Sequence, residues 1–406
     1  MRARVFVLCL SLLLVGVAPA QDSLNVRLIG NCDTPGNAYG VVVTGGNAYV
    51  ADRSAGLRVI SISDPAHPVE TGYYDTPGWA YDVAVCGDYA YVADNTAGLR
   101  VVSVADPAHP AEVGYYDTPG YANGVAVTGD YAYVADDWAG LRVISVADPA
   151  HPTEVGYYRT PGYADGVAVS GSYAYVGSCE PGLRVISVAD PAHPVEVGYY
   201  DTPGDGYGVA VDGGHAYVAD WLAGLRVISI SDPAHPGEVG YYDPPSSDAK
   251  DAAASGHYVY VANRFAGLWV ISVADPAHPT EVGYYDTPGV ALDVAVSGDY
   301  VYVADGNSGL QVCQFYGGGV EEGRQLTANS SRPTTIVRGI LHPPASGVER
   351  KASSELLDIS GRQVMDLHPG GNDVRALAPG VYFVRQQGSR GQGFEDSRVT
   401  KVIITK

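Results

Sequence analysis

Six histidines recur in one short motif, and their type and spacing raise the question of a metal site. The motif Asp-Pro-Ala-His-Pro recurs every 42 or 43 residues, beginning at Asp64, Asp106, Asp148, Asp190, Asp232 and Asp275. Zinc needs ligand atoms within about 2 Å of the metal. Stacked four-stranded units would instead place equivalent residues on the order of 15 Å apart. We therefore predict that His67 and its counterparts form structural turns.

An aspartate ends most copies of a second motif, Tyr-Val-Ala-Asp, and it suggests either calcium binding or turn capping. Ser178 and Asn263 replace it in two copies, and both keep a hydrogen-bond acceptor without the charge. An Asp here can accept backbone N–H bonds from the tight loop that follows. We predict a structural role, with calcium as the alternative, and no other cofactor.

Five arginines stand at equivalent positions of the repeat: Arg58, Arg100, Arg142, Arg184 and Arg226. An arginine inside a sheet packs its stem and pairs its guanidinium with a nearby acid. We expect the aspartate of the same repeat to be the partner, which makes these arginines part of the architecture.

Loops in which the copies differ are the best candidates for function, because the rest of a repeat serves the scaffold. Two loop families, one after Thr-Pro-Gly and one after Tyr-Val-Ala-Asp, are expected to project from one face, the top, around the mouth of a channel. Aromatic residues interleaved with Asp and Asn suit protein hot spots or stacking against sugar rings. The predicted top-face site consists of Trp79, Tyr81, Asp82, Tyr121, Trp138, Tyr163, Asp165, Tyr207, Trp221, Phe265 and Asp293. The alternative is that these aromatic residues fill the channel and seal contacts between repeats.

Catalytic motifs are missing from the sequence: there is no GxSxG, no HExxH, no P-loop and no dinucleotide-binding GxGxxG. The leading interpretation is a non-catalytic protein that binds a surface protein or a polysaccharide. Two alternatives stay open. One is a metal-assisted hydrolase or lyase that uses top-face carboxylates such as Asp82, Asp165 and Asp293. The other is a passive structural surface protein.

The charge of the repeat region argues against a nucleic-acid partner. The chain has a formal net charge of −21, and residues 21–316 hold 36 acidic and only 10 basic side chains. A body this acidic repels phosphate backbones.

The repetition predicts the elements that hold these residues. A turn of the type Asp-Thr-Pro-Gly begins at positions 33, 75, 117, 159, 201, 243 and 286. Each period contains four short apolar runs separated by turn residues, which indicates four strands. Residues 24–33 match a fourth strand, whereas the last copy ends after its third strand at 310–315. Only a closed ring completes the last copy, so we predict an all-β fold with a seven-bladed β-propeller over 21–316, closed by its N-terminal strand.

Ring closure brings two cysteines to the same blade. Cys32 falls on the N-terminal strand and Cys313 on the last strand of the array. We expect them to be near-diagonal neighbours, and a disulfide that locks the ring and two free thiols are equal alternatives. Cys86 and Cys179 fall in turns on opposite faces and are not expected to pair.

The repeat resembles a known family. The tract GLRVISVADPAHPxEVGYYDTPG, followed by VAVxGxYAYVAD, is similar to the LVIVD repeat, with Leu-Arg-Val-Ile-Ser at the five positions that give the family its name. The resemblance covers about residues 24–316. It implies a propeller in an exported or surface protein and implies little about biochemistry.

The two ends of the chain predict export. Residues 1–20 combine two arginines, an apolar run and Ala18-Pro19-Ala20, as in a cleaved signal peptide, and no other run is long enough to span a membrane. After a linker at 317–350, short strands at 351–406 predict a small β-sandwich. The tracts LLDISGRQVMDL, LAPGVYFVR and TKVIITK resemble the C-terminal sorting domain of type IX secretion. That resemblance implies contact with the secretion machinery and a location on the cell surface or outside the cell.

Overall fold

The computed structural model describes residues 23–180, 182–244 and 247–316 together with seven short strands nearer the C-terminus. The chain divides into two compact units, residues 1–319 and 320–406. The signal peptide and most of the linker predicted above lie outside the described residues. No helix in the described part of the chain is long and apolar enough to cross a membrane.

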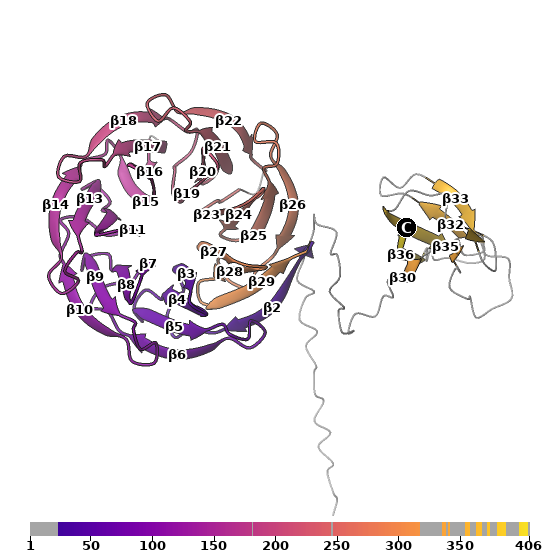
Figure 1. Ribbon diagram of the computed structural model, residues 1–406, viewed down its shortest axis with the longest axis horizontal. Helices are drawn as coiled ribbons and strands as arrows, with labels where there is room; N and C mark the ends of the chain where they lie inside the picture. The colour runs from indigo at the N-terminus through magenta and orange to yellow at the C-terminus, as the bar shows by residue number, and fades with distance from the viewer. Residues whose placement is uncertain are drawn as a thin grey trace, which may run out of the picture. The chain divides into compact units, whose positions relative to one another are not determined.

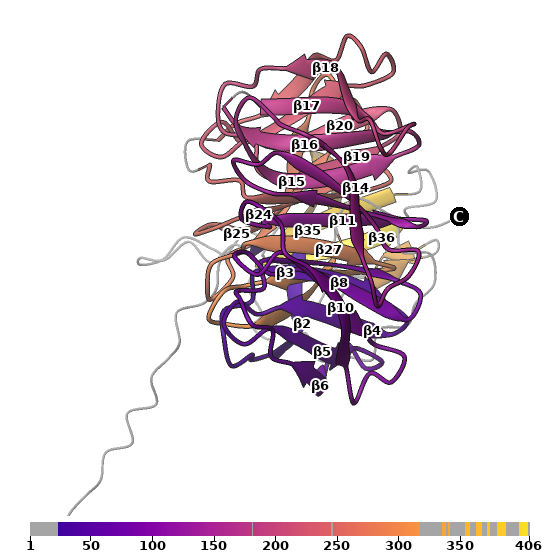
Figure 2. The same ribbon diagram turned by 90° about the vertical axis from the view of Figure 1, so that its left-hand side faces the viewer.

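The first unit is a seven-bladed β-propeller, which confirms the predicted fold (Figures 1 and 2). Blade 1 contains β3 (Gly40–Thr44), β4 (Asn47–Ala51), β5 (Leu57–Ser61) and β6 (Val69–Tyr74). Blade 2 contains β7 (Asp82–Cys86), β8 (Tyr89–Ala93), β9 (Leu99–Ser103) and β10 (Ala111–Tyr116). Blade 3 contains β11 (Gly124–Thr128), β12 (Tyr131–Ala135), β13 (Leu141–Ser145) and β14 (Thr153–Tyr158). Blade 4 contains β15 (Tyr163–Ser170), β16 (Tyr173–Cys179), β17 (Gly182–Ser187) and β18 (Val195–Tyr200).

The remaining blades repeat the same antiparallel order from the axis outward. Blade 5 contains β19 (Val209–Asp212), β20 (His215–Ala219), β21 (Leu225–Ser229) and β22 (Gly237–Tyr242). Blade 6 contains β23 (Asp251–Ser255), β24 (Tyr258–Asn263), β25 (Gly267–Ser272) and β26 (Thr280–Tyr285). Blade 7 contains β27 (Asp293–Ser297), β28 (Tyr300–Ala304) and β29 (Leu310–Phe315).

The N-terminal segment closes the ring and joins two blades. Strand β2 (Val26–Cys32) pairs with β29 as the fourth strand of blade 7, as the sequence predicted. The two residues of β1 (Ser23–Leu24) pair instead with β26 and add a fifth strand to blade 6. Asn25 separates the two strands with a φ of 54°. The N-terminal segment therefore holds blades 6 and 7 together.

Continuous apolar strands follow from the burial of both faces of each blade. On β5, Leu57 and Val59 pack against blade 2, whereas Ile60 packs against blade 7. All three side chains are fully buried. A strand covered on both faces has no polar side to alternate with.

The Tyr-Val-Ala-Asp aspartate has a structural role, but contrary to the prediction its partners are not in the loop that follows it; they lie in the Thr-Pro-Gly turn that leads into its blade. Oδ1 of Asp52 accepts a hydrogen bond from the hydroxyl of Thr34 at 2.7 Å, and Oδ2 accepts one from the backbone N–H of Gly36 at 2.8 Å. Arg58 lies 3.9 Å from the same carboxylate and 2.7 Å from Asp75. The pairing of repeat arginine with repeat aspartate recurs at Arg100, Arg142 and Arg226.

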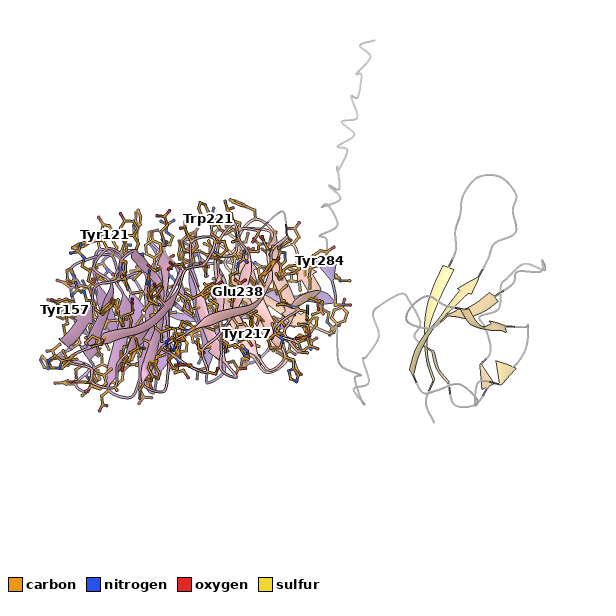
Figure 3. The ribbon with its side chains drawn as sticks, turned by 90° about the horizontal axis from the view of Figure 1, so that it is seen from above. Tyr121, Tyr157, Tyr217, Trp221, Glu238 and Tyr284 are labelled. Carbon is orange, nitrogen blue, oxygen red and sulfur yellow. The ribbon has the colours of Figure 1, made fainter. Side chains whose placement is uncertain are left out.

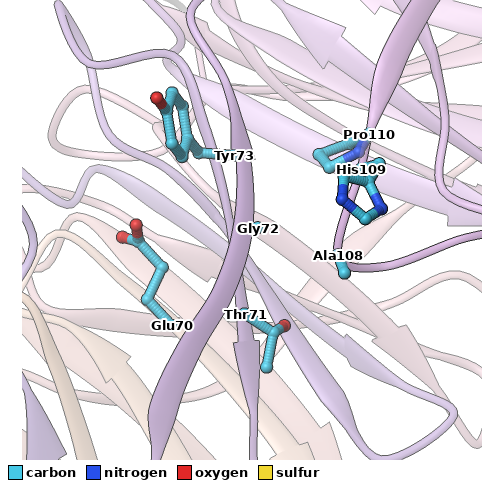
Figure 4. A pocket seen from close by; sticks show the side chains of 7 residues that line it. All are labelled: Glu70, Thr71, Gly72, Tyr73, Ala108, His109 and Pro110. Carbon is cyan, nitrogen blue, oxygen red and sulfur yellow. The ribbon is translucent and has the colours of Figure 1, made fainter.

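The Asp-Pro-Ala-His-Pro turn is also structural. Oδ2 of Asp64 lies 2.9 Å from Nδ1 of His67, and Oδ1 accepts the N–H of Ala66 at 3.1 Å. The five other copies form the same pair. Figure 4 shows side chains that line a groove of about 510 Å³ between β6 of blade 1, which carries Glu70 and Tyr73, and the turn of blade 2 that holds His109.

The described strands of the second unit form two sheets. A five-stranded sheet has the order β30 (Thr335–Val337), β36 (Arg398–Ile404), β35 (Gly380–Gln386), β32 (Ser354–Leu357) and β33 (Gln363–Leu367). A two-stranded sheet pairs β31 (Ile340–Leu341) with β34 (Asn372–Asp373).

Candidate binding site at the channel mouth

The variable loops surround a cavity of about 640 Å³ at one end of the propeller axis. Figure 3 shows two residues of these loops, Tyr121 and Trp221, at the same face, and Tyr157 on the outer wall. The cavity is lined by Asn37, Tyr39, Arg53, Tyr81, Asn95, Tyr121, Asn123, Asp137, Asp165, Tyr207, Lys250, Arg264, Val290 and Leu292.

One position of the repeat contributes a side chain from every blade. In blade 1 this position is Tyr39, the residue directly before β3. Its seven occupants are Tyr39, Tyr81, Asn123, Asp165, Tyr207, Lys250 and Leu292. In six of them the backbone N–H donates to the carbonyl of the alanine near the end of the same blade's second strand. The N···O distance is 2.8 Å for Tyr39 and 2.9 Å for Lys250. The backbone is therefore fixed by the fold, and the side chain is free to vary.

A second position follows Tyr-Val-Ala-Asp and lies between neighbouring blades. Arg53 exchanges two backbone hydrogen bonds with Ala80 of blade 2, at 3.0 and 3.1 Å. Asn95, Asp137, Trp221 and Arg264 form the same bridge to their next blade. Arg53 has a φ of 45°, a left-handed conformation that is unfavourable for residues other than glycine and persists only where the surroundings enforce it. The bridge enforces it here, and four occupants of this position, Arg53, Asn95, Asp137 and Arg264, line the cavity.

Arg53 lies in an aromatic cage. Its Cζ is 5.4, 4.9 and 5.3 Å from the ring centroids of Tyr39, Trp79 and Tyr81. Its Nη2 donates to the hydroxyl of Tyr81 at 3.2 Å. The rings attract the cation through their negative faces and hold the guanidinium in place.

Lys250 contacts residues of blades 4 and 5 at the mouth. Its Nζ is 2.5 Å from Oδ2 of Asp165 and 3.8 Å from the ring centroid of Tyr207. Burial by itself lowers the pKa of Lys250, but Asp165 and the two phenols of Tyr39 and Tyr207 raise it above the usual value, so the amine stays protonated. Burial raises the pKa of Tyr207 to about 12. Lys250 is the one lysine of residues 21–316.

Below the cavity, three carboxylates link neighbouring blades at the start of the innermost strands. This position is occupied by Gly40, Asp82, Gly124, Gly166, Gly208, Asp251 and Asp293. The Asp carboxylates accept the N–H of the next blade: Asp82 from Val125 at 2.8 Å and Asp293 from Val41 at 2.6 Å, across the ring closure. The glycines allow close approach, since a Cβ at Gly40 would lie 2.7 Å from the carbonyl oxygen of Tyr81.

These three aspartates have raised pKa values. Burial, together with the charge of Asp293, raises the pKa of Asp82 to about 7. Burial and the neighbouring Asp251 raise the pKa of Asp293 well above its usual value, and burial also raises that of Asp251. Like charges in a desolvated site disfavour ionisation. Among the described residues, no group of three or more His, Cys, Asp or Glu side chains is arranged to hold a metal ion.

The structure distributes the predicted site residues over three locations. Tyr81, Tyr121, Asp165 and Tyr207 line the cavity. Trp79 packs against Arg53 and Trp221 against Tyr207, with ring centroids 6.3 Å apart in the second pair, so both support lining residues. Asp82 and Asp293 form the blade links below.

Three further predicted residues, Trp138, Tyr163 and Phe265, are exposed and do not line the cavity. Trp138 and Phe265 follow the bridging position by one residue, and their neighbours Asp137 and Arg264 face the cavity instead. The predicted site favoured aromatic and acidic side chains, so it omitted Arg53 and Lys250, although both stand in the two variable loop families. Asp137 and Arg264 were missed because Trp138 and Phe265, one residue further on, were chosen in their place.

Of the two alternatives for Cys32 and Cys313, the structure has the free thiols. The expectation that they are near-diagonal neighbours is wrong. Cys32 pairs with Leu310 and Cys313 with Leu28, so the two cysteines are three residues apart along the ladder. That offset separates them by about 10 Å, beyond the reach of a disulfide, and an odd offset directs the side chains to opposite faces of the blade. Cys313 packs toward blade 6 and Cys32 toward blade 1.

Seven four-stranded blades around one axis define the class of protein as a seven-bladed β-propeller, and solved structures show the same fold. The chain is similar to a chain of the mitotic checkpoint complex, with 12% sequence identity and a TM-score of 0.61 over 78% of this chain and 100% of that one. It is similar to the WD40 repeats of RRP9, with 11% identity and a TM-score of 0.60 over 73% and 99% of the two chains. The designed Ika8 protein, at 6% identity and a TM-score of 0.55, covers 71% of this chain with 99% of its own length.

The sequence family is narrower. The profile of the LVIVD repeat matches residues 35–76, 77–118, 119–160, 161–202, 203–244, 246–287 and 288–313, more than half of the chain. The protein therefore belongs to the LVIVD-repeat family. The last match is short because β2, from the start of the chain, supplies the fourth strand of that blade. No curated protein matches the sequence.

Proposed function

We propose that this protein is a non-catalytic binding module that takes part of a protein partner into its channel mouth. The observation that carries the proposal is the contrast between invariant and variable positions of the repeat. The backbone of the lining positions is fixed by the same hydrogen bonds in blade after blade, whereas their side chains differ in type and charge. The cavity has the size of a ligand pocket and is rich in Tyr, Asn and Arg, which suits recognition of a polypeptide.

A protein partner is favoured over a polysaccharide by the state of the aromatic rings. Sugar recognition would need free ring faces on which to stack. Arg53 already lies over the faces of Tyr39, Trp79 and Tyr81, and Lys250 lies over Tyr207. Tyr121 remains 46% exposed at the rim.

Export to the cell surface or the medium is part of the same proposal. It is supported by the signal-peptide pattern of residues 1–20 and by the sorting-like tracts near the C-terminus. A binding module at the surface would meet its partner there, with the secretion machinery as a transient second partner.

Photo-cross-linking tests the binding proposal. A benzoylphenylalanine in place of Tyr121 samples the cavity, and one in place of Tyr157, which is 59% exposed on the outer wall, is the matched control. We expect irradiation of cells that make the protein to give discrete adducts from position 121 and none of the same mass from position 157. Identical adducts from both positions, or none from position 121, would contradict the proposal and favour a passive structural role.

A further inference from the structure

We infer that Arg53 binds a carboxylate group of the ligand. The ligand of the mouth is then a polypeptide segment with an acidic side chain or a free C-terminus. The inference rests on the proposed function and adds the chemistry of the ligand. Its basis is the unusual environment of Arg53 among the cations of the propeller.

Arg53 is a half-buried arginine without an acid partner. In residues 23–316, the arginines without a carboxylate within 4.0 Å are Arg27, Arg53 and Arg159, and of these only Arg53 is not exposed. The repeat arginines show the opposite behaviour: Arg58 lies within 4.0 Å of three carboxylates. A partly desolvated cation that lacks a counter-charge is unfavourable, so an incoming carboxylate regains that free energy.

The cage leaves donors for a ligand. A guanidinium carries five N–H donors in a planar fork that matches a carboxylate. Among the described residues, the one hydrogen bond found for the Arg53 side chain uses Nη2 and the Tyr81 hydroxyl. The rings of Tyr39, Trp79 and Tyr81 restrain the group without using its other donors, so little entropy remains to be lost on binding.

The surroundings extend this donor surface. Asn37 and Asn95 line the cavity from the same two blades whose residues form the cage. Nδ2 of Asn37 donates to Oδ1 of Asn307 at 2.8 Å and Nδ2 of Asn95 to Oδ1 of Asn123 at 3.4 Å, so each amide has one further N–H for a second carboxylate oxygen. The lining side chains include three cations, Arg53, Lys250 and Arg264, and two acids, Asp137 and Asp165. Lys250 is paired with Asp165, and Arg264 lies 3.6 Å from Asp248, so Arg53 is the one cation of this lining that has no carboxylate within 4.0 Å. An incoming carboxylate would therefore meet its counter-charge at Arg53.

Binding of a labelled peptide tests the inference. The mature full-length chain is titrated into fluorescein-labelled, C-terminally amidated hexaglutamate, and anisotropy is recorded. Amidated hexaglutamine, which has no carboxylate, is the control, and hexaglutamine with a free C-terminus tests the second source of the group. Arg53→Gln should weaken hexaglutamate binding by at least about tenfold, because a charge-assisted hydrogen bond to a half-buried site is lost. Arg159→Gln, at an exposed arginine outside the cavity, should change it by less than about twofold. Circular dichroism spectra establish that both variants are folded.

A second variant covers the case in which Arg53→Gln does not fold. Arg53→Lys keeps the charge and loses the fork, so it should weaken binding several-fold. Equal affinity of the parent and the Arg53 variants, equal binding of amidated hexaglutamine, or no binding of either carboxylate-bearing peptide would overturn the inference. Arg53-dependent binding of hexagalacturonate in place of hexaglutamate would also overturn it, since the ligand would then be an acidic sugar. If any of these results occurs while cross-linking from position 121 succeeds, the proposed binding function stands, and only the proposed role of Arg53 in binding a carboxylate is contradicted.

Discussion

At the scale of single residues, the three aspartates below the cavity combine a structural role with an unfavourable charge. Each carboxylate accepts an N–H of the next blade, yet burial and mutual repulsion raise the pKa of all three. The side-chain hydrogen bond between Asp251 and Asp293 needs a proton on one of them. The N–H bonds favour the ionised carboxylates and lower their pKa values, but burial and the like charges outweigh them.

The resulting prediction concerns the pH dependence of stability. The pKa of Asp82 is raised from 3.8 to about 7 in the folded protein, so the folded state binds this proton more tightly than the unfolded chain. The contribution of Asp82 to folding stability is fully present below about pH 4 and is lost as the pH rises through about 7. Urea unfolding of Asp82→Asn should show a fall in stability between pH 4 and pH 7.5 that is smaller than the parent's by about 3–4 kcal/mol.

The control for this prediction is Asp64→Asn. Asp64 is exposed, and its hydrogen bond with His67 lowers its pKa, so its contribution is present at neutral pH and is lost on acidification. Asp64→Asn should therefore not reduce the loss of folding stability between pH 4 and pH 7.5. An unchanged pH profile in Asp82→Asn would show that Asp82 is ionised without penalty in the folded protein.

At the scale of elements, the blades fit together through glycines on the outer strands. Gly72 on β6 lies under the turn of blade 2, where a Cβ would be 2.3 Å from the carbonyl oxygen of Pro107. Gly114, Gly156 and Gly198 meet the turns of their next blades in the same way. The strand pairing of β5 with β6 is irregular at this point, between Val59 and Ile60. The Asp-Pro-Ala-His-Pro turn is thus the outer contact between successive blades.

Gly72→Ala should destabilise the propeller by about 1–3 kcal/mol, because backbone atoms of the next blade must move to admit the methyl group. Gly237→Ala, on the outer strand β22, is the matched control, since a Cβ there meets no atom within 4 Å and the backbone conformation is ordinary. Denaturant unfolding of the two variants gives the comparison. Equal stability of Gly72→Ala and Gly237→Ala would contradict the proposed tightness of the blade contact.

At the scale of the whole molecule, the binding unit and the unit proposed for sorting are separate compact bodies. The first ends at residue 319, and its ring is closed by β2 from the start of the chain. The core of each blade is completed by the next blade, so the propeller contains its own hydrophobic contacts throughout.

Removal of residues 320–406 should therefore leave the propeller folded and change its destination. We expect the melting temperature measured by circular dichroism to stay within about 2 °C of the parent, and the truncated protein to remain inside the producing cell envelope, away from the surface. Fractionation of the native host, with the full chain as control, gives the second measurement. Surface display of the truncated chain at the parental level would refute the sorting role.

Sequence repetition by itself determined the fold. The spacing of the turns, the four apolar runs in each period and the unmatched fourth strand at 24–33 leave a closed seven-bladed ring as the consistent arrangement, and the structure has it. The structural roles of Asp52 and His67 were predictable for the same reason, since a short polar side chain next to a turn finds its partners within a few residues or in its own repeat.

Only the tertiary structure decided which variable residues form the site and how the cysteines lie. Trp138 and Asp137 are adjacent in sequence, and the bridge between blades determines that Asp137 faces the cavity. The cage around Arg53 uses Tyr39 from its own blade and Trp79 and Tyr81 from the next, and the register of β2 with β29 separates Cys32 from Cys313. A one-residue difference in register reverses the direction of a side chain, and these arrangements depend on contacts between segments far apart in the chain, which no single repeat contains.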